Sequence, residues 1–361
     1  MYSVNKNIKK SKTIASNFYY SQQKFEDIKE SLFAQNWQFI CDTKNLTENG
    51  DSIPYEFIPG YIEEPLLLIN DNGVIKSMSN VCTHRGNILV ENPKNLKQGI
   101  TCRYHGRQFN TCGKFKFMPK CEDVENFPSD NENLIQIPTK QWKQFVFTSI
   151  NPKISFDKLI KEMNERIGWL PIEEFVFSKA NSKEYIVNAN WALYCDNYLE
   201  GFHIPFVHQE LTQNLNYGEY ETEIFQYSNL QIGVGKDDDE CFNLPKESID
   251  YGKKIAAYYF WLLPNLMFNF YPWGLSINIV IPIAPEKTKV KFLSYIWKEN
   301  KLDIGAGADL DKVEKEDEEI VELVQKGVKS RFYDRGHFSP SMEKGIHHFH
   351  LLLSRFTDNQ G

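Results

Sequence analysis

Apolar and polar residues change their spacing along this chain, and the changes divide it into parts. Near the N-terminus an apolar stripe at helical spacing follows Ser21; its members are Phe25, Ile28, Leu32 and Phe33. Because Ser21 can accept a hydrogen bond from the first turn, the stripe predicts an amphipathic helix that begins after Ser21. From Trp37 onwards the pattern changes to short β-rich segments between turn residues, at 55–58, 65–69, 74–78 and 145–150. The sequence Asp-Asn-Gly at 71–73 joins two of these segments and predicts a β-hairpin.

After residue 152 the pattern becomes mixed. Segments rich in β-branched and aromatic residues predict strands at 184–188, 219–227, 256–262, 266–271, 276–283 and 289–297. Several consecutive strands imply an antiparallel sheet, with helices before and after it. The predicted fold class is therefore α+β, with a β-rich domain over residues 37–152. This domain is inserted between an N-terminal helical segment, residues 1–36, and an α+β domain over residues 153–361 to which that segment belongs.

An acidic segment over residues 303–322 contains nine carboxylates and also shows a helical pattern. Its apolar stripe consists of Val313, Ile320, Val324 and Val328, widened by Val321. Asp317 falls at the centre of this stripe, whereas the neighbouring acids Glu316, Glu318 and Glu319 point elsewhere. An acid on an apolar stripe needs a cation or a proton, so Asp317 is either a metal ligand or a buried, hydrogen-bonded acid.

Composition excludes several classes of function. A length of 361 residues allows two or three domains, and the formal net charge of −7 argues against nucleic acid or an anionic membrane surface as a partner. The most apolar stretch, residues 258–273, is interrupted by prolines and asparagines and does not predict a membrane span. Of the seven cysteines, those at 41, 112, 121, 195 and 241 show no disulfide spacing, so we expect them to be reduced thiols in a cytoplasmic protein.

Two pairs of cysteine and histidine residues give the strongest chemical signal. They are Cys82-Thr-His84 and Cys102-Arg-Tyr-His105, and each can place one thiolate and one imidazole at the tip of a loop. Two imidazoles and two thiolates are the ligand set of a Rieske [2Fe–2S] centre, in which neutral imidazoles raise the potential of the cluster. A tetrahedral zinc site would accept the same donors. Zinc patterns usually keep their cysteines together and their histidines together, so the mixed pairs favour the cluster.

A second group of potential metal ligands lies within residues 191–208. On a helix, Glu200 and His203 would be neighbours on one face. Pro205 should end or kink this helix near Ile204, which would let His208 turn back towards the same centre. Two histidines and one carboxylate form the triad that holds non-haem iron and leaves positions open for O2 and substrate. The sequence offers Asp317 as that carboxylate.

With these motifs the chain resembles the α-subunit of a Rieske non-haem iron oxygenase over nearly its full length. The resemblance implies one [2Fe–2S] cluster and one mononuclear Fe(II) per chain. It also implies that Glu200 links by hydrogen bonds to His105 of a neighbouring subunit in a homotrimer. Electrons would come from a separate NAD(P)H-dependent reductase, directly or through a ferredoxin. Asp196, with Asn197 beside it, occupies the place where members often have an Asn or Asp near the iron.

The chain departs from the family pattern at several positions. Arg107 stands where members often have a tryptophan, and Glu200 stands where many aromatic-ring dioxygenases have an aspartate. Respiratory Rieske proteins carry a disulfide between two further cysteines, and the corresponding positions here are Asn87 and Tyr104. These residues favour the lower-potential type of cluster that oxygenases use.

The substrate is predicted from two stretches, residues 196–200 and 325–337, which resemble choline, carnitine and glycine-betaine monooxygenases. This resemblance implies a terminal oxygenase that hydroxylates a carbon next to a quaternary or tertiary amine nitrogen. Aromatic residues that would form a cage for such a cation, or else belong to the core, are Tyr194, Phe202, Trp261, Tyr271 and Trp273. The alternatives are an aromatic-ring hydroxylating oxygenase and a Rieske electron carrier without oxygenase activity. The histidines at 347, 348 and 350 are predicted to be structural or surface residues rather than a further metal site.

Overall fold

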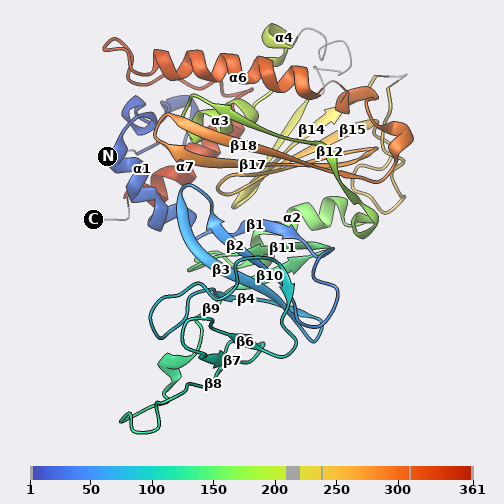
Figure 1. The fold of residues 1–361 in the computed structure, drawn as a ribbon. Helices are drawn as coiled ribbons and strands as arrows, with labels where there is room; N and C mark the ends of the chain where they lie inside the picture. The colour runs from blue at the N-terminus through green and yellow to red at the C-terminus, as the bar shows by residue number, and fades with distance from the viewer. Residues whose placement is uncertain (1–2, 209–219, 237–238, 309, 359–361) are drawn as a thin grey trace. The chain divides into compact units, whose positions relative to one another are not determined.

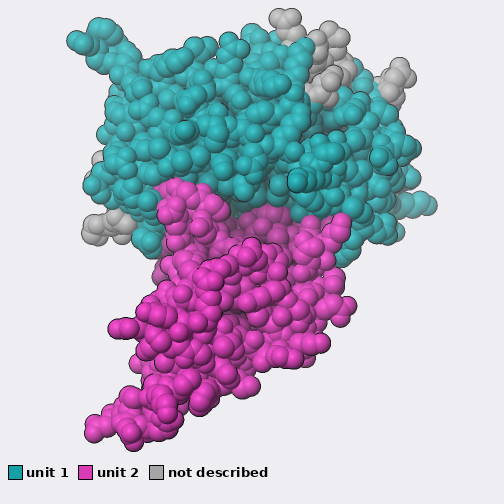
Figure 2. Space-filling view, viewed as in Figure 1, with its two compact units in different colours: residues 1–33, 154–361 teal, residues 34–153 magenta. Residues whose placement is uncertain are grey.

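The computed structural model describes residues 3–208, 220–236, 239–308 and 310–358, and the chain divides into two units. One unit consists of residues 34–153, and the other combines residues 1–33 with residues 154–361 (Figure 2). The sequence predicts 37 and 152 as the limits of the inserted unit.

The inserted unit is built from three small antiparallel sheets. The first has the order β1 (Gln38–Asp42), β11 (Phe145–Thr148) and β10 (Thr139–Trp142). The second has the order β5 (Lys94–Asn95), β2 (Asp51–Ile58), β3 (Ile62–Asp71), β4 (Val74–Ser79) and β9 (Gln136–Ile137). The third has the order β6 (Ile100–Thr101), β7 (Gln108–Phe109) and β8 (Phe115–Phe117).

The hairpin predicted at Asp71-Asn72-Gly73 joins β3 to β4, with Asp71 paired to Val74. Asn72 and Gly73 both have positive φ, 54° and 87°, which is the backbone conformation that a two-residue hairpin turn with the right twist requires. This prediction is confirmed.

The larger unit contains a seven-stranded antiparallel sheet that is accompanied by helices (Figure 1). Its strand order is β12 (Val176–Val187), β18 (Lys287–Ile296), β17 (Gly274–Ala284), β16 (Leu266–Tyr271), β15 (Ile255–Leu262), β14 (Ser228–Val234) and β13 (Glu221–Ile224). The helices are α1 (Gln22–Ile28), α2 (Phe156–Ile167), α3 (Trp191–Tyr198), α4 (Ile204–Val207), α6 (Leu310–Gly327) and α7 (Lys344–Asp358). Helix α6 lies along one side of the sheet and contacts α3 (Figure 1). Single 3-10 turns of this unit lie at Ile8–Lys10, Ser16–Tyr19, Ile172–Glu174, Glu299–Lys301 and Gly305–Gly307, and the inserted unit has one at Asp130–Glu132.

The first helix forms as the sequence predicts. The hydroxyl of Ser21 accepts a hydrogen bond from the backbone N–H of Lys24, and the four apolar residues of the stripe are buried. The helix continues beyond Ile28 as one π-helical turn, Lys29–Phe33. No helix in the described part of the chain is both long enough and apolar enough to cross a membrane.

A row of polar side chains crosses the large sheet. Gln231 of β14 pairs with Tyr259 of β15, Tyr259 pairs with Asn269 of β16, and Asn269 pairs with Ser276 of β17. Directly paired residues in an antiparallel sheet point to the same face, so these four side chains share one face. They are all at least partly buried, which marks this face as the wall of a site rather than a solvated surface.

The sheet differs from the prediction at its β13–β14 edge. The sequence predicts one strand at 219–227, whereas the structure places β13 at Glu221–Ile224 and a further strand, β14, at Ser228–Val234. The prediction missed β14 because Asn229 and Gln231 are polar, as exposed or turn residues usually are, although both are buried here.

Candidate functional site

Two loops of the inserted unit carry the cysteine–histidine pairs, and their backbones repeat one another. In the first loop the N–H of Cys82 donates to Asn87 O at 2.8 Å, and Gly86 N–H donates to Cys82 O at 3.0 Å. In the second loop Cys102 N–H donates to Arg107 O at 2.8 Å, and Gly106 N–H donates to Cys102 O at 3.0 Å.

A glycine makes each of these turns possible. Gly86 and Gly106 have φ of 69° and 73°, a left-handed conformation that other residues adopt at a cost. The same turn therefore presents the ligand residues of both loops.

The four side chains converge as a cluster site requires. The Nδ1 atoms of His84 and His105 lie 3.1 Å apart, and Cys82 and Cys102 are buried beneath them. Burial raises the pKa of the Cys82 thiol, so the thiolate needs a bound positive charge to form at neutral pH. Two imidazoles that face each other through their nitrogens, above two buried thiols, fit a [2Fe–2S] cluster. None of the seven cysteines forms a disulfide.

Arg107 occupies the position of the common tryptophan and is buried next to the second loop. Its guanidinium forms an ion pair with Glu132 and lies 5.7, 4.8 and 5.7 Å from the ring centres of Phe109, Phe115 and Phe127. A planar cation with a carboxylate partner can fill an aromatic pocket in this way. Arg107 therefore places a buried positive charge, paired with Glu132, close to the second loop.

The second metal site is built where α3 ends. Asn190 caps α3, and the helix stops at Tyr198, so that Glu200 and His203 lie in the turn after it. The prediction that Pro205 ends this helix is wrong. Pro205 instead lies in the first turn of α4, where its missing N–H has no helical partner to lose. The short α4 then leads to His208. This helix, rather than a kink at the proline, returns His208 to the same centre as His203.

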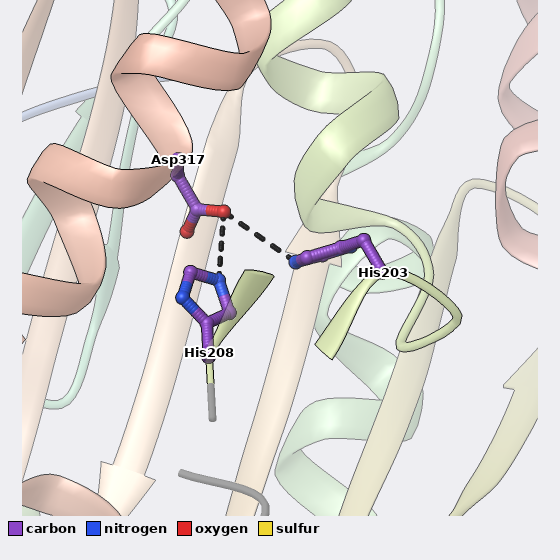
Figure 3. A group of neighbouring side chains, drawn as sticks. All are labelled: His203, His208 and Asp317. Atoms are coloured by element: carbon purple, nitrogen blue, oxygen red, sulfur yellow. Dashed lines mark hydrogen bonds and ion pairs between the residues drawn. The ribbon is translucent and has the colours of Figure 1, made fainter. Parts of the chain in front are cut away.

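His203, His208 and Asp317 come together at one point (Figure 3). One potential ligand atom from each lies within 4.8 Å of the others. Asp317 Oδ1 is 3.4 Å from Nε2 of His203 and 2.9 Å from Nε2 of His208. The side chains of His208 and Asp317 are only 2% and 15% exposed, so this is an interior site with the donor set of a 2-His-1-carboxylate centre.

Each histidine is held from behind by a second carboxylate. Nδ1 of His203 lies 2.6 Å from Glu200 Oε1, and Nδ1 of His208 lies 2.8 Å from Glu316 Oε2. A proton on each Nδ1 leaves Nε2 directed at Asp317, which is how carboxylates orient metal-binding imidazoles. The expectation that Glu316 points elsewhere is wrong, because His208, at the end of α4, lies alongside α6.

The three central side chains favour a bound positive charge. Burial lowers the pKa of His203, but Asp317 and Glu200 outweigh this effect and raise that pKa to about 9. Burial alone would raise the pKa of Asp317, yet the two histidines lower it to about 2. A carboxylate that stays ionised in the interior between two imidazoles fits a divalent metal ion.

Asn197 and Asp196 point to different sides of α3. Asn197 donates from Nδ2 to Asp317 Oδ1 at 2.7 Å and so holds the carboxylate in place. Asp196 instead accepts from the hydroxyl of Tyr19 at 2.8 Å and lies 2.9 Å from Nε2 of His350. Of the two neighbours, the structure brings Asn197 to the triad and ties Asp196 to Tyr19 and to α7.

The apolar stripe of α6 is only partly buried. Val321 and Val328 are buried, but Val324 is 43% exposed. Asp317 nevertheless faces the interior, as the centre of the stripe predicts.

A cavity extends from the triad to the polar face of the sheet. Its walls include His203, His208 and Asp317, together with Gln231, Asn269 and Asn278 from the sheet and Val313, Glu314 and Leu310 from α6. Five tyrosines also line it, namely Tyr194, Tyr198, Tyr220, Tyr259 and Tyr271.

The aromatic cage differs from the prediction. Tyr194 and Tyr271 line the cavity, whereas Phe202 is 42% exposed and Trp261 lies in the core. Trp273 lines a neighbouring cavity. The prediction missed Tyr198, Tyr220 and Tyr259, because they come from the end of α3, the residue before β13 and β15, and only the tertiary structure brings these three elements to one cavity.

Comparison with known proteins gives matches to both units. Residues 36–128 match the Rieske [2Fe-2S] domain, and residues 176–358 match the catalytic domain of the ring hydroxylating alpha subunit. The chloroplastic choline monooxygenase of Arabidopsis thaliana is 28% identical over 96% of this chain and 83% of its own length. The carnitine monooxygenase oxygenase subunit of Escherichia coli K12 is 29% identical over 95% of this chain and 93% of its own.

A solved structure shares the whole fold. It is a quaternary ammonium Rieske monooxygenase, described for carnitine oxidation and inter-subunit electron transfer. It is 26% identical, superposes with a TM-score of 0.76 and covers 98% of this chain and 100% of its own. The predicted α+β fold class and the two predicted cofactors, a [2Fe–2S] cluster and a mononuclear iron, are confirmed by these matches. The chain belongs to the ring-hydroxylating α-subunit family of Rieske non-haem iron oxygenases, enzymes that act on a small molecule with O2 and need a separate electron-transfer partner.

Proposed function

We propose that this chain is the terminal oxygenase component that hydroxylates a carbon next to a quaternary or tertiary amine nitrogen. The observation that carries the proposal is the tyrosine-lined cavity that opens directly onto the group of His203, His208 and Asp317. Aromatic faces attract an alkylammonium ion, and the cavity would hold that ion beside the metal site. The choline and carnitine monooxygenases among its relatives support the same class of substrate.

We assign the ligands from the geometry of each site. His203, His208 and Asp317 would hold the mononuclear iron, and Cys82, His84, Cys102 and His105 would hold the cluster. Bound in these places, the iron supplies O2 activation and the cluster supplies single electrons.

The protein's own side chains position these parts. Glu200 and Glu316 accept from the Nδ1 of the two histidines and fix the ring planes, and Asn197 fixes the carboxylate of Asp317. Gln231 donates to the backbone O of Tyr198 at 2.6 Å, while the hydroxyl of Tyr198 donates to Asn269 at 2.7 Å. The cavity wall is therefore hydrogen-bonded before substrate enters, which keeps the reacting carbon in place.

The route of the electrons follows from Glu200. In this chain Glu200 already holds His203, so a hydrogen bond from the neighbouring subunit's His105 to the same carboxylate would connect the cluster of one subunit to the iron of the next. This arrangement needs a neighbouring copy of the chain, which the inter-subunit electron transfer described for the solved relative supports, and we propose that the copies form a homotrimer. We propose an NAD(P)H-dependent reductase, with or without a ferredoxin, as the donor.

A single-turnover experiment tests the proposal. Iron-loaded protein, reduced without oxygen, is mixed with O2 and either a quaternary amine or a simple aromatic compound, and products are identified by mass spectrometry. We expect one added oxygen on the amine, or an aldehyde together with a dealkylated amine. A ring diol without any amine product would contradict the proposal, and iron content of about two rather than about three per chain would point to an electron carrier.

A further inference from the structure

In the described part of the chain, the cavity beside the metal site is lined by acidic but not by basic side chains. Three carboxylates line it, those of Glu200, Glu314 and Asp317, and no lysine or arginine of the described residues does. The stretches of sequence outside the described ranges contain no lysine or arginine at all. Lys183, which lines a neighbouring cavity, is already paired with Asp311 at 2.6 Å.

A metal ion bound at the triad would not make the net charge of the cavity lining positive. A ferrous ion would bring two positive charges against the three carboxylates. With the histidines neutral and Glu314 ionised, as it would be beside a bound cation, the lined cavity would keep one negative charge. One monovalent cation in the cavity would bring the sum to zero. A zwitterion would leave the negative charge in place and would put its own carboxylate among three others.

Glu314 is the carboxylate that the triad does not use. Asp317 and Glu200 both contact His203, whereas the one hydrogen bond that the described residues give Glu314 comes from the hydroxyl of Tyr194, at 2.6 Å. Glu314 stands one helical turn before Asp317 on α6, so both carboxylates face the cavity from the same side of the helix. Burial and the negative charge of Asp317 raise the pKa of Glu314, which is the state of an acid that lacks a cationic partner.

Aromatic rings line the same cavity. Tyr259 and Tyr271 lie with their ring centres 5.8 Å apart and their planes at 79°, an edge-to-face pair that forms a corner of the cavity wall. Glu314, Tyr259 and Tyr271 all line this cavity. Asn269 and Asn278, from the neighbouring strands, add amide groups that can hydrogen-bond a substrate hydroxyl.

We infer that Glu314, with the corner formed by Tyr259 and Tyr271, is the subsite for the substrate's ammonium group, and that this chain prefers a cationic amino alcohol over an amino acid betaine. The inference rests on the proposed function and narrows it, because the relatives include both a choline and a carnitine monooxygenase. A neutral amide wall suits a hydroxyl group, while a carboxylate would meet no cationic partner there.

The test uses holoenzyme with both metal centres loaded, and compares dissociation constants measured by calorimetry without oxygen. The probes are choline, carnitine, and the neutral isostere of choline in which a tert-butyl group replaces the trimethylammonium group. We expect the wild-type protein to bind choline at least about tenfold more tightly than either of the other two. Glu314→Gln, which keeps an acceptor for Tyr194, should lose about tenfold for choline and leave binding of the neutral isostere unchanged.

Two further variants separate this role from a structural one. Glu314→Asp should restore part of the preference for choline, and Glu319→Gln removes the same charge from an exposed position of α6 and should change neither constant. Iron content and the electron paramagnetic resonance signal of the cluster confirm loading of each variant. If wild-type protein binds carnitine as tightly as choline, or if Glu314→Gln weakens both choline and its neutral isostere equally, the inference is overturned. If only this inference fails, single turnover would still give hydroxylated amines. If the proposed function fails, no hydroxylated amine would form, so the two failures can be told apart.

Discussion

The contact between Glu316 and His208 leads to a quantitative prediction about iron affinity. Removing the carboxylate that supports a metal-binding histidine typically costs 10- to 100-fold in metal affinity, about 1.4 to 2.7 kcal/mol. His208 is 2% exposed, but Glu316 is 33% exposed, so water partly screens the interaction. We therefore expect Glu316→Ala to weaken Fe(II) binding by about tenfold, the lower end of that range.

The corresponding change at Glu200 should have the larger effect. Glu200 is only 11% exposed and lies 2.6 Å from His203 Nδ1, so less solvent competes with this contact. We expect Glu200→Ala to weaken Fe(II) binding by about 100-fold. The order of the two losses, rather than either value alone, tests the argument from burial.

The assay is a competition between the protein and a coloured Fe(II) chelator, carried out without oxygen on protein that retains its cluster. Glu319→Ala removes an exposed acid from the same helix and serves as the control. Glu316→Gln keeps an acceptor for the Nδ1 proton and should recover most of the affinity. If Glu316→Ala stays within twofold of Glu319→Ala, the assigned support of His208 is wrong.

Three further predictions follow from other contacts. Asp317→Ala should lower the iron content from about three to about two per chain while the cluster signal remains, measured by elemental analysis and electron paramagnetic resonance. Gly86→Ala and Gly106→Ala should each cost about 1–2 kcal/mol because φ is 69° and 73° in the two cluster loops, and urea denaturation followed by cluster absorption measures this cost. Asp250→Asn should cost about 3 kcal/mol because it leaves the buried guanidinium of Arg166 with one carboxylate fewer. Burial raises and Arg166 lowers the pKa of Asp250, with a net lowering, so the difference between Asp250→Asn and the wild-type protein should be constant near neutral pH and shrink as the pH falls below about 4.

Two of these predictions have a matched control variant, and the first has a clear contradicting outcome. If Asp317→Ala lost the iron of the cluster as well as the mononuclear iron, the assignment of two separate metal centres would be contradicted. Gly60→Ala introduces the same left-handed strain at φ 83° in a turn between β2 and β3, and should lower stability without lowering cluster content. Glu165→Gln breaks an exposed ion pair on α2, the helix that carries Arg166, and should change stability by less than about 0.5 kcal/mol. An equal loss in Glu165→Gln and Asp250→Asn would refute the argument from burial.

Local sequence determined the parts of this protein whose geometry depends on neighbours in the chain. The Asn-Gly turn between β3 and β4, the helix that Ser21 caps, and most strands could be predicted because their signals lie within a few residues. The same holds for the cluster loops. Their cysteine, histidine and glycine residues are close in sequence, and the chemistry of those residue types identifies the cofactor.

Tertiary structure decided which distant side chains meet. His208 and Asp317 are 109 residues apart, and helical periodicity could select Asp317 but could not show that Glu316 would reach His208 Nδ1. The link between Asp196 and His350 spans 154 positions and gives no local signal.

The substrate cavity depends on tertiary structure most of all. Gln231, Tyr259 and Asn269 share one face because of the strand register, and a shift by one residue would turn each of them to the opposite face. The sequence therefore determined the metals and the reaction class, since ligand chemistry is a property of residue types at short spacing. Only the packing of α6 against the sheet decided that Glu314 and the tyrosines surround one cavity, because long-range pairing fixes which polar residues are buried together.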